Sequence, residues 1–242
     1  MRLSHPSVRL RAILRFRAIL RLRAIWDRLT GGAAKPASAP AILDTGLRLR
    51  IRRSFNEASH DEEHFPSTID PRILHVQVLL KFFGTLADKC VLDVGCGKGR
   101  FARVLQEQNP GVRISALDIS EEMLACVPAG IQRIAGMMTE LPFAASAFDC
   151  VYATESLEHA VETDRAVAEM CRVLKPGGKL VIIDKNAEHW GRFKTPAWER
   201  WFERRELENL LRRDCSSVHS EFLSYWEDVE PDGLFLVWFA RK

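Results

Sequence analysis

Apolar and polar positions between residues 90 and 186 follow two different periods. Short apolar runs such as "CVLDVG" (90–95), "FDCVYATES" (148–156) and "KLVIIDK" (179–185) have the length and composition of buried strands. The segments between these runs, for example "FARVLQEQ" (101–108), place their apolar residues at helical spacing. Alternating strands and helices predict βαβ units. We therefore expect an α/β fold with a parallel sheet and helices on both of its faces.

Further elements are predicted on either side of this region. In residues 69–86 the apolar side chains recur at helical spacing, with Asp70 as the expected N-cap and Pro71 at the first helical position. Residues 195–215 predict another helix, and two strands joined at residues 231–233 follow it.

The electric charge of the chain is unevenly distributed. The 242 residues carry a formal net charge of +3, but residues 1–53 contain 13 Lys and Arg against two Asp, a net charge of +11, which leaves −8 for the rest. The stretch "TGGAAKPASAPA" (30–41) has the composition of a linker, and "RLRIRR" (48–53) forms a second basic patch. The basic character therefore belongs to an N-terminal extension, and one folded domain follows it.

The basic arm, residues 1–30, leaves three interpretations open. Its apolar runs are at most three residues long, so we expect neither a membrane span nor a signal-peptide core within it. On a helical projection its arginines scatter around the axis, which weakens the case for an amphipathic anchor. The arm is then a solvated extension, a peripheral contact with an anionic membrane, or a contact with nucleic acid or a protein partner.

The six cysteines show neither a CxxC pair nor the spacing of metal ligands. This pattern predicts reduced thiols, no metal site and a cytoplasmic location. Peripheral attachment to the membrane surface is the alternative that the arm leaves open.

Three glycines, Gly95, Gly97 and Gly99, follow directly after the first apolar run. In a parallel α/β sheet, the turn after the first strand is where a ligand approaches the backbone. Asp118 ends the next predicted strand, at about the sequence separation from which a carboxylate reaches ribose hydroxyls. A dinucleotide fingerprint would need glycine where the chain has Arg100, so a pyrophosphate site is disfavoured. A tight turn without a ligand is the structural alternative.

Four blocks in this order resemble the class I S-adenosylmethionine-dependent methyltransferases, especially the ubiquinone/menaquinone-biosynthesis-like (type 11) group. The blocks are "VLDVGCGKGRFA", "ALDISEEML", "LPFAASAFDCVYATESLEHA" and "EMCRVLKPGGKLVIID", and they extend over about residues 88–186. The resemblance implies a Rossmann-like, seven-stranded, mostly parallel sheet with an antiparallel C-terminal strand, and S-adenosyl-L-methionine as the cofactor. It also implies that Pro176 ends a helix and that the glycines after it reverse the chain.

The same resemblance implies roles for individual residues near the glycine turn. Gly95, Cys96 and Gly97 would line the methionine and ribose part of the cofactor. Asp93 would hold the turn or meet the methionine amine. Asp118 would accept both ribose hydroxyls, because a carboxylate offers two acceptor oxygens.

The adenine end departs from the family pattern at one position. Ile119 and Met123 would pack on the ring, with ordinary core packing as the alternative. The family usually has an acidic residue after the glycine at position 136, whereas this chain has Met137. Either the backbone N–H of Met138 holds the adenine, or cofactor binding is weakened or lost. The missing hydrogen bond amounts to about 0.5–1.5 kcal/mol, so we expect binding to be retained.

Candidates for a catalytic base follow two of the predicted strands. Glu155, which we also expect to contact the cofactor, Glu158 and His159 follow one strand, and His189 follows the last parallel strand. Glu158 and His159 recur in family members with different substrates, which favours a structural role for both. For His189 an exposed position without a role is the alternative. Methyl transfer needs a base only where the acceptor must lose a proton.

The predicted organisation has five segments. They are the basic arm (1–30), the linker with the second basic patch (31–53), a helical cap over the cofactor cleft (54–89), the S-adenosylmethionine-binding core (90–186), and a C-terminal helix with closing strands on the substrate side (187–242). We expect methyl transfer to a small or amphiphilic metabolite. The alternatives are a non-catalytic scaffold with this fold and a nucleic-acid methyltransferase recruited by the arm, although the net charge of −8 outside the arm disfavours nucleic acid. The acceptor, the methylated atom and the oligomeric state stay open.

Overall fold

The computed structural model describes residues 43–242. The predictions for the basic arm and for most of the linker lie outside these described residues. Residues 189–197 belong to a separate compact unit and are described by themselves. The main unit comprises the other described residues up to 188 and residues 198–242.

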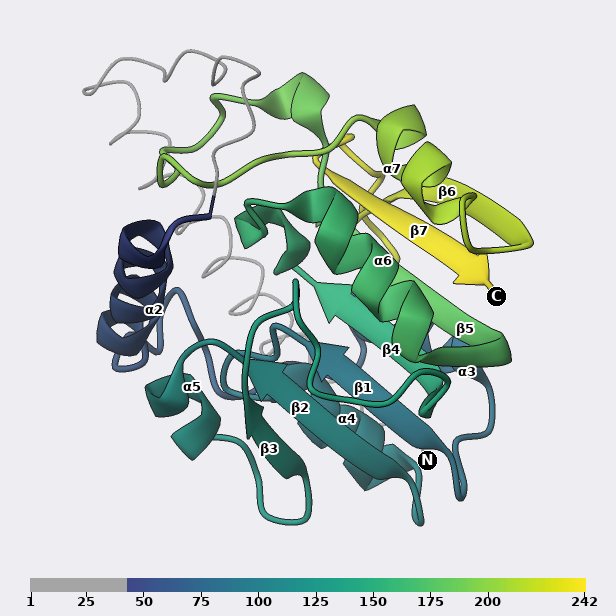
Figure 1. Cartoon of the computed structure of the whole chain (residues 1–242). Coiled ribbons are helices and arrows are strands. Elements are labelled where there is room, and N and C mark those ends of the chain that lie inside the picture. Colours follow the sequence, from purple (N-terminus) through teal and green to yellow (C-terminus); the bar gives the residue numbers. More distant parts are fainter. Residues whose placement is uncertain (1–42) are drawn as a thin grey trace. The chain divides into compact units, whose positions relative to one another are not determined.

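A seven-stranded sheet forms the centre of the main unit (Figure 1). Its strands are β1 (Cys90–Val94), β2 (Arg113–Asp118), β3 (Gln132–Ala135), β4 (Phe148–Thr154), β5 (Leu174–Lys185), β6 (Ser217–Leu223) and β7 (Phe235–Arg241). The strand order is β3-β2-β1-β4-β5-β7-β6. Strands β1 to β5 pair in parallel, and β7 runs antiparallel to both β5 and β6. The predicted fold class, including the antiparallel C-terminal strand, is confirmed.

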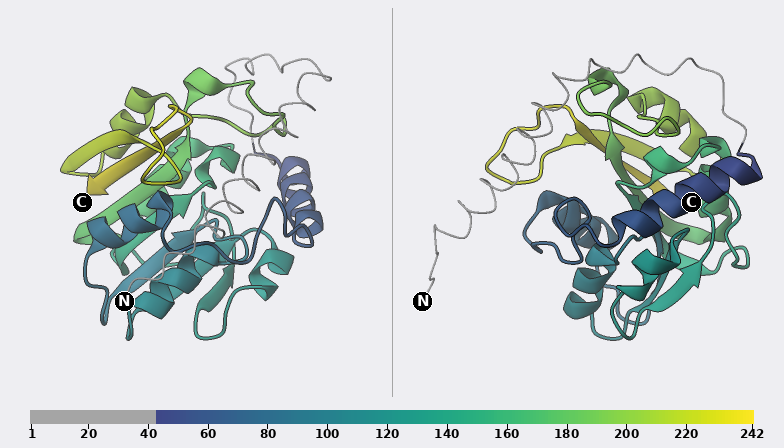
Figure 2. Two further views of the ribbon diagram at one scale, coloured as in Figure 1. Left: turned by 180° about the vertical axis from the view of Figure 1, so that it is seen from behind. Right: turned by 90° about the vertical axis from the view of Figure 1, so that its left-hand side faces the viewer.

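Helices cover both faces of this sheet. They are α2 (Thr45–Ala58), α3 (Leu74–Phe83), α4 (Arg100–Gln108), α5 (Glu121–Ala125), α6 (Thr163–Val173) and α7 (Arg204–Leu211), with short 3-10 turns η1 (Leu157–His159) and η2 (Ala187–His189). Helices α6 and α7 lie on one face and α3 and α4 on the other (Figures 1 and 2). Among residues 43–242, no helix is both long and apolar enough to cross a membrane.

The apolar periodicity explains how the sheet is held. Leu92 and Val151 on the central strands, Leu180 on β5 and Met170 on α6 are all fully buried in one core cluster. Each such side chain contributes about 1.5–3 kcal/mol by leaving water. The carboxyl ends of β1, β2 and β4 therefore stay at one edge of a rigid sheet, where the predicted site residues lie.

Three predicted helix boundaries are wrong. The helix expected over residues 195–215 forms only as α7, Arg204–Leu211, because the backbone N–H of Phe202 donates instead to the carbonyl oxygen of Lys185 at the end of β5. Helix α3 begins at Leu74 with Ile73 as its N-cap, rather than at Pro71. The Asp70 carboxylate instead accepts a hydrogen bond from the backbone of Arg72 (2.9 Å) and makes an ion pair with its side chain, which holds a turn ahead of the helix. Helix α6 ends before Leu174, and the Pro176 segment is a bulge inside β5.

The second basic patch lies within a regular helix. Helix α2 begins at Thr45, and the side chain of Asp44 accepts a hydrogen bond from the backbone of Leu47 (2.6 Å) as an N-cap. Arg48 to Arg53 therefore belong to a helix that continues across the segment boundary predicted at residue 53.

Candidate functional site

The glycine turn folds back over the end of β2. The backbone N–H groups of Gly95 and Cys96 both donate to the carbonyl oxygen of Leu117, at 2.8 and 3.0 Å. Gly97 and Gly99 have φ angles of +52° and +74°, a left-handed conformation that side chains disfavour. Helix α4 starts immediately after this turn.

Two of these glycines are needed for different reasons. A Cβ at Gly95 would lie 2.5 Å from the Cβ of Ser156, so packing alone requires glycine there. A Cβ at Gly97 would meet no heavy atom within 4 Å. Gly97 therefore leaves open space against the backbone of the turn, which is the cradle that a bound ligand needs.

Asp118 stands beside this open space. One of its carboxylate oxygens accepts from the backbone N–H of Gly97 (2.8 Å) and the other from that of Ser120 (2.9 Å). Burial raises the pKa of Asp118, and these backbone bonds oppose the rise. A carboxylate has about four acceptor sites, so each oxygen retains capacity for a hydroxyl donor.

Asp93 lies deeper, at 2% exposure. The hydroxyl of Tyr152 donates to its carboxylate at 2.8 Å, and burial raises the pKa of Asp93 to about 7. Cys96 is also buried, and burial raises the pKa of its thiol well above the usual value. The hydrogen bond joins Asp93 to β4 and not to the glycine turn, so both predicted roles of Asp93 stay predictions.

The side chains predicted to meet adenine differ in exposure. Met123 is buried in α5 at 1% exposure, whereas Ile119, Met137 and Met138 are half-buried. The methyl group of Met138 lies 3.4 Å from the position that a Cβ on Gly95 would take. Met138 therefore borders the glycine turn, and contact of all four side chains with adenine stays a prediction.

Residues ahead of the sheet also reach this turn. The Lys98 side chain is 1% exposed, and its ammonium donates to Glu62 at 2.6 Å. Ser120, directly after β2, donates through its hydroxyl to the Asn56 side chain of α2 (2.7 Å). These contacts join residues 56–62 to the ends of β1 and β2, while the helical cap over the cofactor cleft stays a prediction. Neither Lys98 nor Glu62 is among the predicted site residues.

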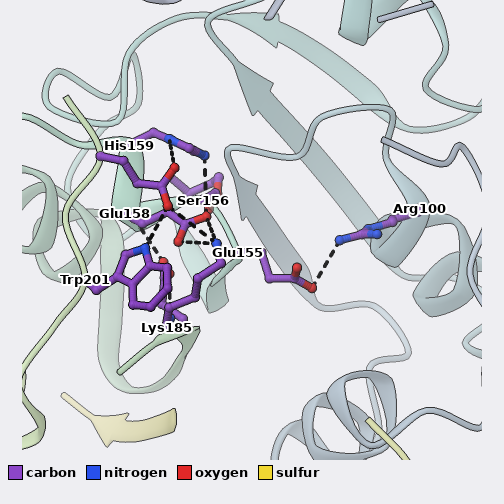
Figure 3. Close-up of polar contacts among 10 residues, drawn as sticks. Arg100, Glu155, Ser156, Glu158, His159, Lys185 and Trp201 are labelled. Atoms are coloured by element: carbon purple, nitrogen blue, oxygen red, sulfur yellow. Dashed lines mark hydrogen bonds and ion pairs between the residues drawn. The ribbon is translucent and has the colours of Figure 1, made fainter. Parts of the chain in front are cut away.

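A second group of polar residues follows β4. Glu155 has a φ angle of +52°, which is unusual for a residue with a side chain. Its carboxylate accepts from Arg100 (3.2 Å) and from the hydroxyl of Tyr225 (2.8 Å). Figure 3 shows Glu155 directed toward Arg100 and away from the cluster around Glu158.

The cluster around Glu158 is built on Lys185, at the end of β5. The ammonium of Lys185 donates to both carboxylate oxygens of Glu158 and lies 3.8 Å from Glu199 (Figure 3). Burial disfavours the charged carboxylate, but the ammonium outweighs it and holds the pKa of Glu158 below its usual value. The indole of Trp201 donates to Glu199 at 2.7 Å.

His159 borders the same cluster. Its Nε2 lies 3.5 Å from Glu158 and its Nδ1 lies 3.9 Å from Glu199, while its ring packs edge-on against Phe55 of α2 at 4.9 Å between centroids. Burial lowers the pKa of His159 to about 4, so the imidazole is neutral at physiological pH. Glu158, His159 and Glu199 present possible metal ligands within 4.8 Å of one another, but the ammonium of Lys185 already supplies a positive charge beside them.

The segment that contains the glycine turn and Glu158 matches a known protein family. Residues 92–182 match the family described as "Methyltransferase domain". These residues form a methyltransferase domain. The match contains the glycine turn, Asp118 and the Glu158 region, so the resemblance inferred from the four sequence blocks is confirmed.

A curated relative matches a longer part of the chain than the family model does. A demethylmenaquinone methyltransferase from Renibacterium salmoninarum is 38% identical over 155 residues, which cover 61% of this chain and 64% of that protein. The chain thus spans less than two thirds of that relative's length.

Solved structures share the fold at low sequence identity. The [4+2]-cyclase SpnF has a TM-score of 0.65 at 19% identity, covering 88% of this chain and 98% of that one. Phosphoethanolamine N-methyltransferase 2 of Haemonchus contortus, solved with phosphomonomethylethanolamine and S-adenosylhomocysteine, has a TM-score of 0.64 at 16% identity, covering 83% of this chain and 60% of that one. Because a cyclase shares the fold, architecture alone does not decide the reaction.

His189 belongs to the separate unit rather than to the main unit that holds the methyltransferase domain. It ends the turn η2, is half-buried, and its carbonyl oxygen accepts from the backbone of Arg192 at 3.1 Å. Its role as a base therefore stays a prediction.

Several residues of the site carry no signal in the sequence. Arg100 stands out in the sequence only because a dinucleotide fingerprint would have glycine at that position, and Lys185, Glu199 and Tyr225 belong to no motif. Tyr225 meets Glu155 across 70 positions of sequence. Only their burial and charge pairing in the folded chain identify them.

His75, near the start of α3, is a further buried group that the sequence did not single out. It is 0% exposed and its ring stacks on Tyr225 at 4.2 Å between centroids, with Phe235 edge-on at 5.1 Å. Among the described residues neither ring nitrogen has a hydrogen-bond partner. Burial lowers the pKa of His75 to about 4.

Acid is therefore expected to weaken folding through His75. The folded protein keeps the imidazole neutral down to about pH 4, whereas the unfolded chain takes up a proton below about pH 6.5. The contribution is fully present above pH 6.5 and falls by up to about 3 kcal/mol as the pH drops to 4. Asp93, with its pKa raised to about 7, acts in the opposite direction over the same range.

A comparison of unfolding free energies between wild type and a variant without the imidazole separates the contribution of His75 from that of Asp93. In His75→Phe the aromatic stack on Tyr225 is kept and the titrating group is removed. We expect the difference in unfolding free energy between variant and wild type to change by about 2–3 kcal/mol in favour of the variant between pH 7 and pH 4.5, measured by urea denaturation. A difference that does not vary with pH would contradict this assignment.

Proposed function

We propose that this chain transfers a methyl group from S-adenosyl-L-methionine to a small or amphiphilic acceptor. The observation that carries the proposal is the open space at Gly97, bordered by the carboxylate of Asp118, inside a methyltransferase domain. An unliganded tight turn would account for the φ angle of +52° at Gly97, but not for the open space beside the Asp118 carboxylate.

The cofactor supplies an activated methyl group on its sulfonium, so the residues of the chain mainly bind and align. The backbone of Gly95 to Gly97 would lie along the methionine and ribose part, and Asp118 would accept the ribose hydroxyls. Glu155, with Arg100 beside it, offers opposite charges near the zwitterionic methionine end. Met138 and Ile119 would border adenine.

The acceptor class rests on the relatives and on the chemistry of the second cluster. One relative is named for demethylmenaquinone and one structural neighbour for phosphoethanolamine, which are a lipophilic and a small polar acceptor respectively. We propose that the acceptor enters on the side of η1, where His159 and Phe55 lie. The cytoplasmic location and the peripheral membrane contact of residues 1–53 are part of the same proposal.

The proposal is tested first by calorimetric titration with S-adenosylmethionine and S-adenosylhomocysteine. Transfer of a labelled methyl group into lysate fractions of lipid, small molecules and nucleic acid then identifies the acceptor. Absence of cofactor binding in the millimolar range would overturn the proposal. Label in the nucleic-acid fraction alone would assign the recruited nucleic-acid methyltransferase instead.

Substitutions at Met137 test whether the chain binds the cofactor or is a non-catalytic scaffold. We expect Met137→Asp to bind S-adenosylmethionine equally well or up to about tenfold more tightly, because a carboxylate at this position accepts from the adenine amine. Met137→Leu is the matched control, since it changes shape but adds no acceptor. Weaker binding of Met137→Asp than of Met137→Leu would place adenine elsewhere.

A catalytic base is expected to be His189 rather than Glu158 or His159. Glu158 is held ionised by Lys185 and has a lowered pKa, and His159 has a pKa of about 4, so both are weak proton acceptors. His189→Ala should lower kcat about 100-fold with unchanged cofactor affinity, and His159→Asn less than tenfold. Full turnover in both variants would indicate an acceptor that needs no deprotonation.

A further inference from the structure

The outward side of helix α2 is a basic surface with one apolar residue at its centre. The exposed side chains are Arg48, Leu49, Arg50, Arg52 and Arg53. At about 100° per residue, two arginines lie on each side of Leu49 within an arc of about 200°. Leu49 is 50% exposed. We call these five residues the α2 basic face.

The positive charge of this face is only slightly compensated. Arg53 makes an ion pair with Glu57 one turn later (3.0 Å), and both side chains are more than two thirds exposed. Within residues 43–242, no ion pair joins Arg48, Arg50 or Arg52 to an acidic side chain. The face thus retains three or four positive charges on one side of one helix.

The opposite side of α2 touches the candidate site. Ile51 is buried and Phe55 packs against His159. Figure 2 shows α2, the purple helix, in two further views. A surface that binds the outer side of α2 would therefore stand one helix diameter, about 10 Å, from the acceptor side.

We propose that the α2 basic face docks on an anionic phospholipid surface and, in a step that rests on the proposed function, holds the acceptor side of the site at the membrane. Each arginine gains about 1 kcal/mol near an anionic lipid surface, and an exposed leucine among them gains by entering the boundary between headgroups and acyl chains. A nucleic-acid backbone would engage the arginines but would leave Leu49 in water. The centre of the face therefore favours lipid.

Vesicle co-sedimentation of the full chain tests the surface without cofactor or acceptor, so its outcome is independent of methyl transfer. The vesicles contain phosphatidylglycerol and phosphatidylcholine, or phosphatidylcholine alone. Replacing the four arginines of the face by glutamine should lower partitioning into anionic vesicles about 100-fold at low salt. The same change at Arg15, Arg17, Arg21 and Arg23 of the arm removes equal charge and should cost at least tenfold less, because on a helical projection these four arginines scatter around the axis and share no face with a central apolar residue.

The central leucine has its own matched control. Leu49→Gln should lower partitioning several-fold, with the loss persisting at high salt, because burial of an apolar side chain is not screened. Val229→Gln changes a residue of similar exposure, 47%, in the loop between β6 and β7 and should leave partitioning unchanged. Equal losses in the α2 and arm variants, no binding to anionic vesicles at low salt, or oligonucleotide binding that depends on the face while vesicle binding does not, would each overturn the proposal.

Discussion

Gly97→Val is expected to weaken binding of S-adenosylmethionine at least 100-fold. The side chain would occupy the open space against the turn and would also strain a backbone whose φ angle is +52°. The hydrogen bond from Gly97 to Asp118 sits at the same point, so displacement of the turn would disturb the predicted ribose site as well. Calorimetric titration measures the loss.

Gly177→Val separates lost binding from backbone strain. Gly177 has a φ angle of +75° and a Cβ there would also meet no atom within 4 Å, but it lies in the bulge at the start of β5. We expect this variant to be destabilised like Gly97→Val and to bind the cofactor with wild-type affinity. Equal affinities for the two variants would show that the space at Gly97 holds no ligand.

Lys185→Met is expected to lower the free energy of unfolding by about 3–5 kcal/mol, because removal of one partner leaves a buried charge uncompensated. Glu158 is 3% exposed, so little water can replace the lost ammonium. Methionine keeps a similar length and apolar stem, which limits the effect of cavity formation. Urea denaturation at neutral pH measures the difference.

A second substitution tests whether charge is the cause. Adding Glu158→Gln to Lys185→Met removes the stranded carboxylate, and more than half of the lost stability should return. A single variant that loses less than about 1 kcal/mol, or a double variant that is no more stable than the single one, would mean that the Lys185–Glu158 pair contributes no net stability.

Much of the sheet could be predicted because apolar periodicity is a local property. Strands β1 and β4 are almost continuously buried, and their composition shows it. Strand β3 was not identified, since it has four residues at the sheet edge and is mostly exposed. Its place depends on pairing with β2, which no pattern within Gln132–Ala135 records.

The proximity of the glycine turn and Asp118 could also be predicted from the sequence, for a topological reason. Val94 and Leu117 are paired in parallel register, so the residues that follow each strand emerge at the same edge. That register brings Gly97 and Asp118 within hydrogen-bond distance across 21 positions of sequence. The start of α3 was misplaced because Asp70 binds Arg72 in a turn, an outcome that competes with N-capping for the same side chain.

By itself, the sequence determined the alternation of strands and helices, the glycine turn with Asp118 after the next strand, and the family to which residues 92–182 belong. Only the tertiary structure decided that Lys185 neutralises Glu158, that Tyr225 reaches Glu155, and that α2 has its arginines outside and Phe55 against His159. Periodicity and turn chemistry act between residues a few positions apart. A buried charge, by contrast, is stabilised by whichever partner the fold brings within a few ångströms, and that distance does not exist until the chain has folded.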